Sequence, residues 1–428
     1  MSWAGVDTGL IEAGKGRRLE TRRLLYLLGL VIVLLSAVRW ITGADDLTSS
    51  GTYGAALRLA VPILLAGLGG LYAERTGVVN IGLEGMMILG TWFGAWAGVE
   101  YGVWWGVVLG MAGGLVGALV HAVATITFGV NQIVSGVAIN ILAAGVARFL
   151  SVIAFSGQGG GATQSPQIPT RLPHVTVPVL AGGDVFGWQS PDVLGWLERE
   201  RWFLVSDLSA LLRGFMDDLS ILTVITLLLV PTTFYFLWRT KLGLRMRSAG
   251  ENPEAAESLG VPVYTMKYLG VLISGALAGL AGAFLVLEAA GIYREGQTGG
   301  RGFIGLAAMI FGNWRPTGVA SAAGLFGYAD ALNLRSAPAV HALVLFAAIA
   351  LAALGAWYLY RRRFTGAAIA VVIGGLALLW FGVTDSVPRQ FVSSAPYVAT
   401  LVVLAVASQR LRPPAADGLP YRRGQQTT

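Results

Sequence analysis

The sequence predicts an all-α, polytopic membrane protein, and three observations support this fold class. Only 12% of the residues are charged while 55% are hydrophobic, and the mean hydropathy is +0.67, whereas an ordinary soluble domain has about 25% charged residues. The apolar residues form continuous runs, whereas a transmembrane barrel would alternate with a period of two. The 59 glycines are typical of helices that pack closely in lipid. We therefore expect roughly 10–12 transmembrane segments, one of them broken or re-entrant.

A membrane helix needs about 20 consecutive apolar residues. The runs that predict such helices are, in chain order, 24–42, 55–72, 78–97, 103–126, 133–155, 221–238, 268–290, 317–334, 341–360, 367–383 and 396–407. The run 303–311 is too short for an upright crossing. We expect it to form a half-helix or re-entrant segment that neighbouring protein shields from lipid.

The first run follows a basic arm, residues 1–23, and resembles the hydrophobic region of a signal peptide. It ends beside Arg39 and Trp40 rather than at a small-residue cleavage site. We therefore interpret it as a retained span, with cleavage as the alternative.

The basic residues also predict the orientation of the chain. Lysine and arginine are concentrated in the arm 1–23, the loop 239–267, the triplet 361–363 and the tail 411–428. Such segments remain on the cytoplasmic side, so we expect a transmembrane domain over 24–410 in the inner (cytoplasmic) membrane, with both termini in the cytoplasm.

The longest polar loop, 156–219, has no lysine and more acidic than basic residues, so we predict that it is extracellular. Within it, the segment 194–203 has the pattern of an amphipathic helix. Its Trp196 and Trp202 are expected at the depth of the lipid headgroups.

Several kinds of chemistry are not expected of this chain. It has no cysteine, and His121, His174 and His341 are far apart in sequence, so no metal site is predicted. No nucleophile, base and acid arrangement and no Walker sequence is present, so we expect no catalytic residue and no cofactor bound by this chain. The net charge of +7 is distributed as an orientation signal, so nucleic acid is not an expected partner.

Five polar residues within the apolar runs are candidates for a solute pathway. Asn80 and Glu84 are four residues apart and share a helix face, and Glu84 should face a cavity or a partner because an ionisable group is costly in lipid. Asn131, Gln132 and Asn140 place amides along the start of another span, where they suit a neutral polar solute. Hydrogen bonding between helices is the alternative for both groups.

The glycine-rich segment 298–318 lacks the Lys-Ser/Thr pair of a phosphate loop, so nucleotide binding there is not expected. It predicts a glycine-broken start to a short helix, followed by a turn at 313–316. Broken helices of this kind lie beside transport pathways.

The polar segment 239–260 lies between two long apolar runs and predicts a short capped helix. Asn252 is suited to the N-cap, Pro253 to the first helical position, and Glu254 to the positive end of the helix dipole. Gly260 and Pro262 end the helix. About two turns are too few for stability in water, so we predict that a partner docks here, with a plain loop as the alternative.

Three segments in this order, 74–85, 245–260 and 302–307, resemble the permease subunits of ATP-binding-cassette importers of the branched-chain amino acid and simple-sugar group. Within that group the resemblance is strongest to nucleoside permeases, and the tail 413–421 is similar to the end of those subunits. The resemblance covers most of 57–334 and resumes near 387. The segment 341–383 and the composition of 156–219 depart from the family pattern.

The resemblance implies a permease domain that works with other subunits. The expected partners are two ATPase subunits that use the ATP, a second related permease (a heterodimer, with a homodimer as the alternative), an external solute-binding protein and membrane lipid. The loop 239–267 then contains the coupling helix that docks in an ATPase groove. Its expected contact residues are Gly250, Glu251, Asn252, Pro253, Glu254, Ala255, Ala256 and Gly260.

The expected function is transport of a small polar solute of the nucleoside class, with simple sugars such as ribose as the alternative. Two rivals from other classes are an ion-coupled secondary transporter, with Glu84 carrying the ion, and a scaffold that transports nothing. The sequence favours neither, because ion-coupled sites need more intramembrane carboxylates than the chain offers.

Overall fold

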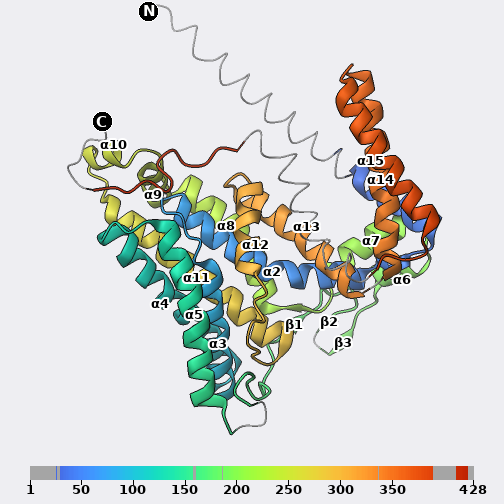
Figure 1. The fold of residues 1–428 in the computed structure, drawn as a ribbon. Helices are drawn as coiled ribbons and strands as arrows, with labels where there is room; N and C mark the ends of the chain where they lie inside the picture. The colour runs from blue at the N-terminus through green and yellow to red at the C-terminus, as the bar shows by residue number, and fades with distance from the viewer. Residues whose placement is uncertain are drawn as a thin grey trace, which may run out of the picture. The chain divides into compact units, whose positions relative to one another are not determined.

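The computed structural model describes residues 26, 29–157, 161–185, 187–335, 337–388 and 411–422, and nearly all regular structure in these residues is helical (Figure 1). Seven described helices are long and apolar enough to cross a membrane: Asp45–Glu74, Val103–Thr127, Gln132–Phe155, Ile221–Arg239, Val263–Ala290, Pro338–Tyr360 and Phe364–Val383. The prediction of a polytopic α-helical membrane protein is confirmed. The predicted arm 1–23 and run 396–407 lie outside the described residues.

The chain divides into two compact units. We name them the core unit, residues 55–176, 218–331 and 394–428, and the flanking unit, residues 1–54, 177–217 and 332–393. The two segments that depart from the family pattern, 341–383 and most of 156–219, thus belong largely to the flanking unit. Each unit consists of three separate stretches of the chain, which come together only in the folded protein.

The core unit contains most of the long helices. They are α2 (Ser50–Glu74, whose first turn belongs to the flanking unit), α3 (Leu83–Tyr101), α4 (Val103–Ala122) with the π-helical turn η2 (Val123–Thr127), α5 (Gln132–Phe155), α8 (Ile221–Arg239), α11 (Val263–Phe284) with the π-helical turn η3 (Leu285–Ala290), α12 (Arg301–Phe311) and α13 (Pro316–Arg335, whose last turn belongs to the flanking unit). A short antiparallel pair joins β1 (His174–Val175) to β4 (Leu219–Ser220).

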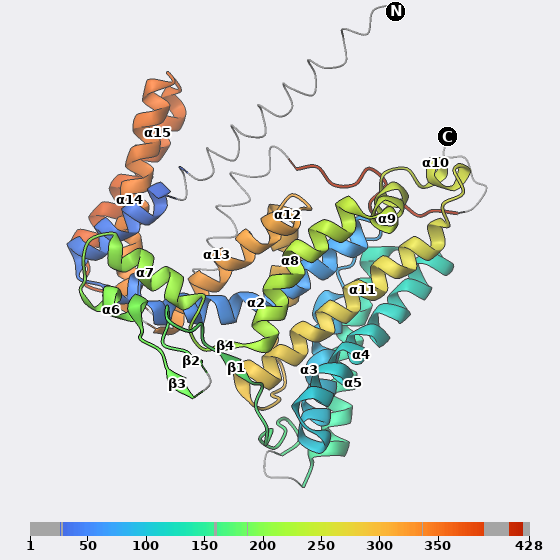
Figure 2. The same ribbon diagram turned by 180° about the vertical axis from the view of Figure 1, so that it is seen from behind.

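Glycines allow α3, α4 and α11 to pack with their backbones close together (Figure 2). A Cβ added at Gly114 would lie 2.1 Å from the carbonyl oxygen of Gly275, and one at Gly90 would lie 2.3 Å from that of Gly279. Real Cβ atoms do not approach so closely, so each position requires glycine. This is the small-residue packing that the composition predicted.

The predicted helix starts were wrong in both directions. The run 78–97 is not one helix, because residues 78–82 are irregular and α3 begins only at Leu83. The reason is local: the Asn80 side chain accepts a hydrogen bond from the Gly82 amide at 3.1 Å, and this turn competes with helical bonding. In contrast, α11 begins earlier than the predicted residue 268, at Val263.

The segment 298–318 agrees with its prediction of a broken helix. Gly300 has φ +79° at the N-cap of α12, and α12 is only 11 residues long. Asn313 and Trp314 both have positive φ, which forms the turn before α13.

The flanking unit contains the helix Gly29–Thr42, the 3-10 turn η1 (Asp45–Leu47), the strand pair β2 (Asp184–Val185) and β3 (Trp188–Gln189), and the helices α6 (Val193–Arg199), α7 (Val205–Gly214), α14 (Ala337–Tyr360) and α15 (Phe364–Val383). The helices α14 and α15 pack against each other along their length (Figure 1).

The predicted amphipathic helix 194–203 is replaced by two short helices. α6 ends at Arg199 and α7 begins at Val205, because Arg201 and Leu204 have positive φ and interrupt the helix. Trp196 and Trp202 remain about half exposed, as expected of interfacial residues.

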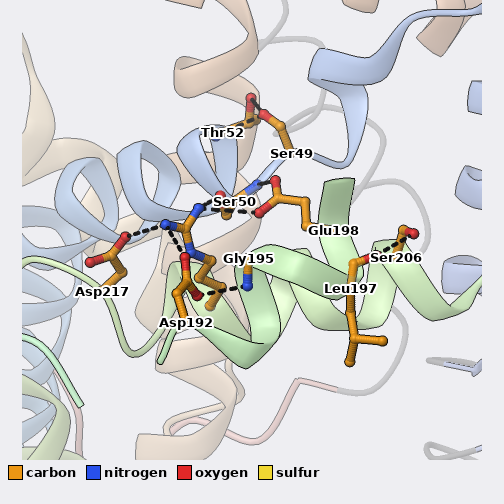
Figure 3. A network of polar contacts seen from close by, with 10 residues as sticks. Ser49, Ser50, Thr52, Asp192, Gly195, Leu197, Glu198, Ser206 and Asp217 are labelled. Carbon is orange, nitrogen blue, oxygen red and sulfur yellow. Dashed lines mark hydrogen bonds and ion pairs between the residues drawn. The ribbon is translucent and has the colours of Figure 1, made fainter. Parts of the chain in front are cut away.

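A network of charged side chains holds the flanking unit together (Figure 3). Asp192, Glu198 and Asp217 surround the guanidinium group of Arg213, at 2.9, 3.4 and 3.4 Å, and Glu198 also accepts a hydrogen bond from the Ser50 amide at 2.8 Å. This network joins the loop 177–217 to the start of α2.

A second ion pair of the flanking unit is more deeply buried. Arg39 Nε lies 3.2 Å from Asp207, and these side chains are only 8% and 1% exposed. Asp207 also accepts a hydrogen bond from the Thr48 hydroxyl. Buried charges must be paired in this way, because an isolated buried charge is very costly.

Candidate functional site

The polar loop 239–267 folds into two short helices, α9 (Lys241–Glu251) and α10 (Pro253–Ser258). The predicted capping of α10 is confirmed: the Asn252 side chain accepts a hydrogen bond from the Ala255 amide at 3.0 Å, and Pro253 occupies the first helical position. Gly260, with φ +80°, follows the end of the helix.

The sequence analysis did not predict α9 as a helix of its own, although two signals were present. The Thr240 side chain accepts a hydrogen bond from the Gly243 amide at 3.0 Å and caps the helix. Met246, Ala249 and Gly250 are buried on one face, with the spacing of an amphipathic helix.

The predicted coupling residues differ in how far they are buried. Ala256 and Gly250 are buried and hold the two helices to the core unit, while Pro253 and Glu254 are half-buried. The outward positions are Glu251, Asn252, Ala255 and Gly260. Leu259, directly after α10, is 84% exposed. The outer face of α10 is therefore free to contact another protein.

Gly250 contacts the turn 75–77 between α2 and α3. A Cβ added at Gly250 would lie 2.4 Å from the Arg75 carbonyl oxygen and 2.9 Å from the Gly77 amide nitrogen. A side chain at this position would therefore push α9 away from the turn. Movement of α9 and α10 is mechanically linked to the ends of α2 and α3 through this contact.

Polar contacts reinforce the turn 75–77. The Arg75 guanidinium donates to the Trp314 carbonyl at 2.7 and 3.2 Å and lies 3.7 Å from Glu251. The Trp314 indole donates to Glu74 at 2.6 Å, and Lys267 donates to the Gly77 carbonyl at 3.1 Å. Burial lowers the pKa of Arg75, and the charge of Glu251 opposes this shift. Arginine remains charged in any case.

The described part of the tail, residues 411–422, lies along α9 and α10 (Figures 1 and 2). The Ala416 amide donates to the Gly250 carbonyl at 2.9 Å, and the Ala415 amide donates to Glu251 at 3.2 Å. These contacts hold the described tail against α9.

Two further contacts fix the ends of the described tail. The Arg412 amide donates to the Asn313 side chain at 2.8 Å. The Tyr421 hydroxyl donates to Glu257 on α10.

Asp417 anchors the middle of the tail in the core unit. Burial raises the pKa of this carboxyl group to about 6, while a hydrogen bond with Glu74 and the charge of Lys267 oppose the shift. The described tail therefore lies beside the coupling loop and carries a carboxyl group whose pKa is raised to about 6.

The predicted pathway residues meet, with one exception, around the segment 78–85, which comprises the irregular residues 78–82 and the first turn of α3. Asn80 is fully buried and donates to the Ser274 hydroxyl at 2.9 Å. Gln132 accepts a hydrogen bond from the Val79 amide at 2.6 Å.

Asn140 also binds this segment. It accepts from the Gly85 amide at 2.7 Å and donates to the Ile81 carbonyl at 3.0 Å. The exception, Asn131, caps α5 by accepting from the amides of Ile133 and Val134 at 2.9 and 3.2 Å.

Glu84 links the start of α3 to the start of α12. Its carboxylate accepts hydrogen bonds from the amides of Gly300 and Gly302 at 2.9 and 2.7 Å. A carboxylate at a helix N-terminus is favoured by the helix dipole, and hydrogen bonds to charged groups are the stronger ones. The short helix α12 is therefore positioned by a charge on another helix.

The sequence analysis missed His121, which is fully buried and also binds the segment 78–85. Its ring nitrogens lie 3.0 Å from the Ser135 hydroxyl and 3.1 Å from the Val79 carbonyl. Both partners are on other elements, so no sequence spacing reveals this role.

A polar cavity of about 400 Å³ lies at the other end of α11 and η3 from α10. Glu288, whose side chain is 5% exposed, faces it and lies 3.0 Å from His174 and 4.0 Å from Arg58. Arg58 also lies 3.6 Å from Asp218. The core unit thus has polar sites at both ends of one long helix.

Membrane-length helices, a buried polar segment at a helix break and a docked polar loop together define a membrane transport subunit. A family model described as the permease component of branched-chain amino acid transport systems matches residues 52–354, and the chain belongs to this family. Its members are transport components of ATP-binding-cassette systems rather than enzymes, and separate subunits hydrolyse the ATP. The sequence-based family assignment is confirmed.

Three relatives illustrate the similarity. The guanosine ABC transporter permease protein NupQ of Bacillus subtilis is 32% identical over 87% of this chain and 96% of its own length. The nucleoside ABC transporter permease protein NupC of Lactococcus lactis is 30% identical over 85% and 93%. The putative glucose ABC transporter permease protein TsgC13 of Haloferax volcanii is 33% identical over 67% and 78%. No solved structure matches the chain.

Proposed function

We propose that this permease moves nucleosides across the cytoplasmic membrane, driven by two ATPase subunits that dock on α10. A second, related permease subunit and an external solute-binding protein complete the importer. The observation that carries this proposal is the capped helix α10, which is held to the core unit through Gly250 and Ala256 and presents Asn252, Ala255 and Leu259 outward. In this orientation both termini and the loop 239–267 are cytoplasmic, and 156–219 is external.

Nucleosides are supported by the two relatives whose names include guanosine and nucleoside and that match 87% and 85% of this chain. Uncharged amide side chains around 78–85 are suited to a neutral solute with many hydroxyl and amino groups. A simple sugar is the second candidate, supported by the relative named for glucose.

The coupling residues transmit movement by two routes. Gly250 and Glu251 contact the turn 75–77 and its Arg75, so that displacement of α9 moves the ends of α2 and α3. The capped helix of Asn252, Pro253, Glu254, Ala255 and Ala256 ends at Gly260, and α11 begins at Val263 directly afterwards. Closure of the ATPase subunits then shifts a two-state equilibrium between inward and outward openings.

Asn80, Glu84, Gln132 and Asn140 form the gate of the solute pathway in this proposal, with Asn131 at its margin. Their hydrogen bonds to 78–85 and to the start of α12 hold the broken helices together. Movement of α2 and α3 exchanges some of these bonds for bonds to the solute. The capping role of Glu84 also gives no support to its being an ion carrier.

The proposal is tested by reconstituting the complete importer in proteoliposomes and measuring guanosine uptake and ATP hydrolysis together. Gly250→Ala should hydrolyse ATP with little uptake, because its Cβ would clash with the Arg75 carbonyl. The matched control is Gly145→Ala, where an added Cβ meets no atom within 4 Å and uptake should be normal. Coupled uptake at the wild-type ratio by Gly250→Ala would contradict the proposal.

A further inference from the structure

A groove of about 250 Å³ lies between the coupling helix and the C-terminal tail. One wall is formed by residues 251–254, and the other by residues 415, 416 and 419–422. The two walls are more than 150 residues apart in sequence, so the groove exists only while the tail is docked. We name it the composite groove.

The tail wall is fixed rather than loosely placed. Its backbone amides at Ala415 and Ala416 bond to Glu251 and to the Gly250 carbonyl, at 3.2 and 2.9 Å. Ala416 is 7% exposed. The Tyr421 hydroxyl donates to Glu257 on α10, and Asp417 lies half-buried beside Glu74. These contacts therefore fix the two walls of the groove relative to each other.

The rim of the composite groove is apolar. Leu419, which is 57% exposed, and the exposed Pro420 both line the groove. These residues lie outside the membrane-length helices, so lipid does not account for their exposure. Neighbouring exposed apolar residues with a polar surround are typical of a protein interface.

The carboxylates of Glu251 and Glu254 line the groove and can accept a further cationic partner. Arg422 contributes a guanidinium group to the same lining, and Glu251 already lies 3.7 Å from Arg75. A lysine or arginine side chain fits both features, because its aliphatic stem packs on apolar surface while its head pairs with a carboxylate.

We propose that the C-terminal tail is the second half of the ATPase-docking surface, and that the composite groove receives a basic side chain of the ATPase subunit. This inference rests on the proposed function, since it needs an ATPase that docks on α10. Its consequence is a second mechanical route. The ATPase holds the tail as well as α10, and Asp417 carries the movement to the end of α2 beside Glu74.

The first experiment uses the absence of cysteine from the chain, which makes any introduced thiol unique. Leu419→Cys, labelled with a benzophenone maleimide in the complete importer, should form a photo-crosslink to the ATPase subunit, because the excited benzophenone inserts into a C–H bond of a neighbouring residue. Leu180→Cys, on a loop of the flanking unit and 40% exposed, is the matched control and should form none. Absence of the crosslink from Leu419→Cys would overturn the proposal.

The second experiment measures retention of the ATPase on the purified permease. Leu419→Lys should weaken retention by about tenfold, because it removes one apolar anchor and repels a basic side chain, while Leu419→Met retains the ATPase. Leu180→Lys controls for the added charge. The affinity of the wild type should also fall more steeply with salt than that of Glu254→Gln, because a charge pair is screened. Wild-type retention by Leu419→Lys, or an equal salt dependence, would exclude the basic side chain.

The two proposals fail in different ways. If Gly250→Ala uncouples transport while Leu419→Lys behaves as the wild type, the ATPase docks on α10 without the tail. If neither variant has an effect, the ATPase does not act through this region and the proposed function fails as well.

Discussion

Different interactions stabilise the interior of the core unit and the interior of the flanking unit. In the core unit, backbones meet at glycines, and buried polar side chains such as Asn140 and Glu84 bind backbone amides and carbonyls. In the flanking unit, buried charges are paired with each other, as in Arg39 with Asp207. Hydrogen bonds to backbone groups can be exchanged for bonds to a solute, whereas breaking a buried ion pair leaves an uncompensated charge. The comparison suggests that the core unit is built to rearrange and the flanking unit to remain fixed.

The largest effect is expected from Asp207→Ala. It leaves Arg39 buried without its partner and removes the acceptor of Thr48, which should destabilise the flanking unit by about 3–5 kcal/mol. Limited proteolysis should detect faster cleavage within 177–217. Asp184→Ala, at an exposed position, is the control. Unchanged proteolysis of Asp207→Ala would show that the ion pair does not hold this unit.

Gly114→Ala should destabilise the core unit by about 1–3 kcal/mol, because the new Cβ would lie 2.1 Å from the Gly275 carbonyl oxygen and the helices must separate. Thermal unfolding in detergent measures the effect. Gly375→Ala has open space at its Cβ and should unfold as the wild type. Equal stability of the two variants would refute close backbone packing of α4 and α11.

Glu84→Gln should weaken the link between α3 and α12 by about 1–2 kcal/mol, since the charge-assisted bonds to Gly300 and Gly302 become neutral and one acceptor is lost. Hydrogen exchange of the first turn of α12 should become faster, and uptake should fall while insertion is retained. Wild-type exchange in this variant would contradict the capping role.

The smallest effect concerns the pH dependence of tail docking. The pKa of Asp417 is raised to about 6 in the docked tail, from about 4 when exposed to water. Its stabilising contribution is therefore fully present below about pH 4 and is lost as the pH rises through about 6. Spin-label mobility at a single cysteine replacing Arg422 should increase between pH 5 and 7.5.

Asp417→Asn provides the control for this titration, because the amide cannot ionise. Its tail mobility should not change over the same pH interval. A tail that becomes more mobile on acidification would reverse the sign and refute the burial of a protonated Asp417.

The features that the sequence predicted correctly have local causes. The caps of α10 at Asn252 and Gly260 lie within one short segment, and membrane helices are visible as apolar runs. The break before α12 was predicted from its glycines in the same way.

The features that it did not predict depend on distant partners. The late start of α3 follows from the Asn80 turn, which is stabilised by Ser274 on α11. His121 gains its role only when Val79 lies beside it. The composite groove joins residues near 253 to residues near 419. Such contacts leave no periodic pattern in the sequence. For the same reason, the sequence did not predict that three separate segments form the flanking unit.

The central claim is that α10 is the contact through which a separate ATPase drives this permease. The most direct test is site-specific crosslinking of Ala255→Cys, an exposed position on α10, in cells that express the complete importer. The account predicts a crosslink to the ATPase subunit and no labelling of this thiol by membrane-impermeant reagents added outside. A thiol that is labelled from outside, or that crosslinks to no ATPase, would contradict it.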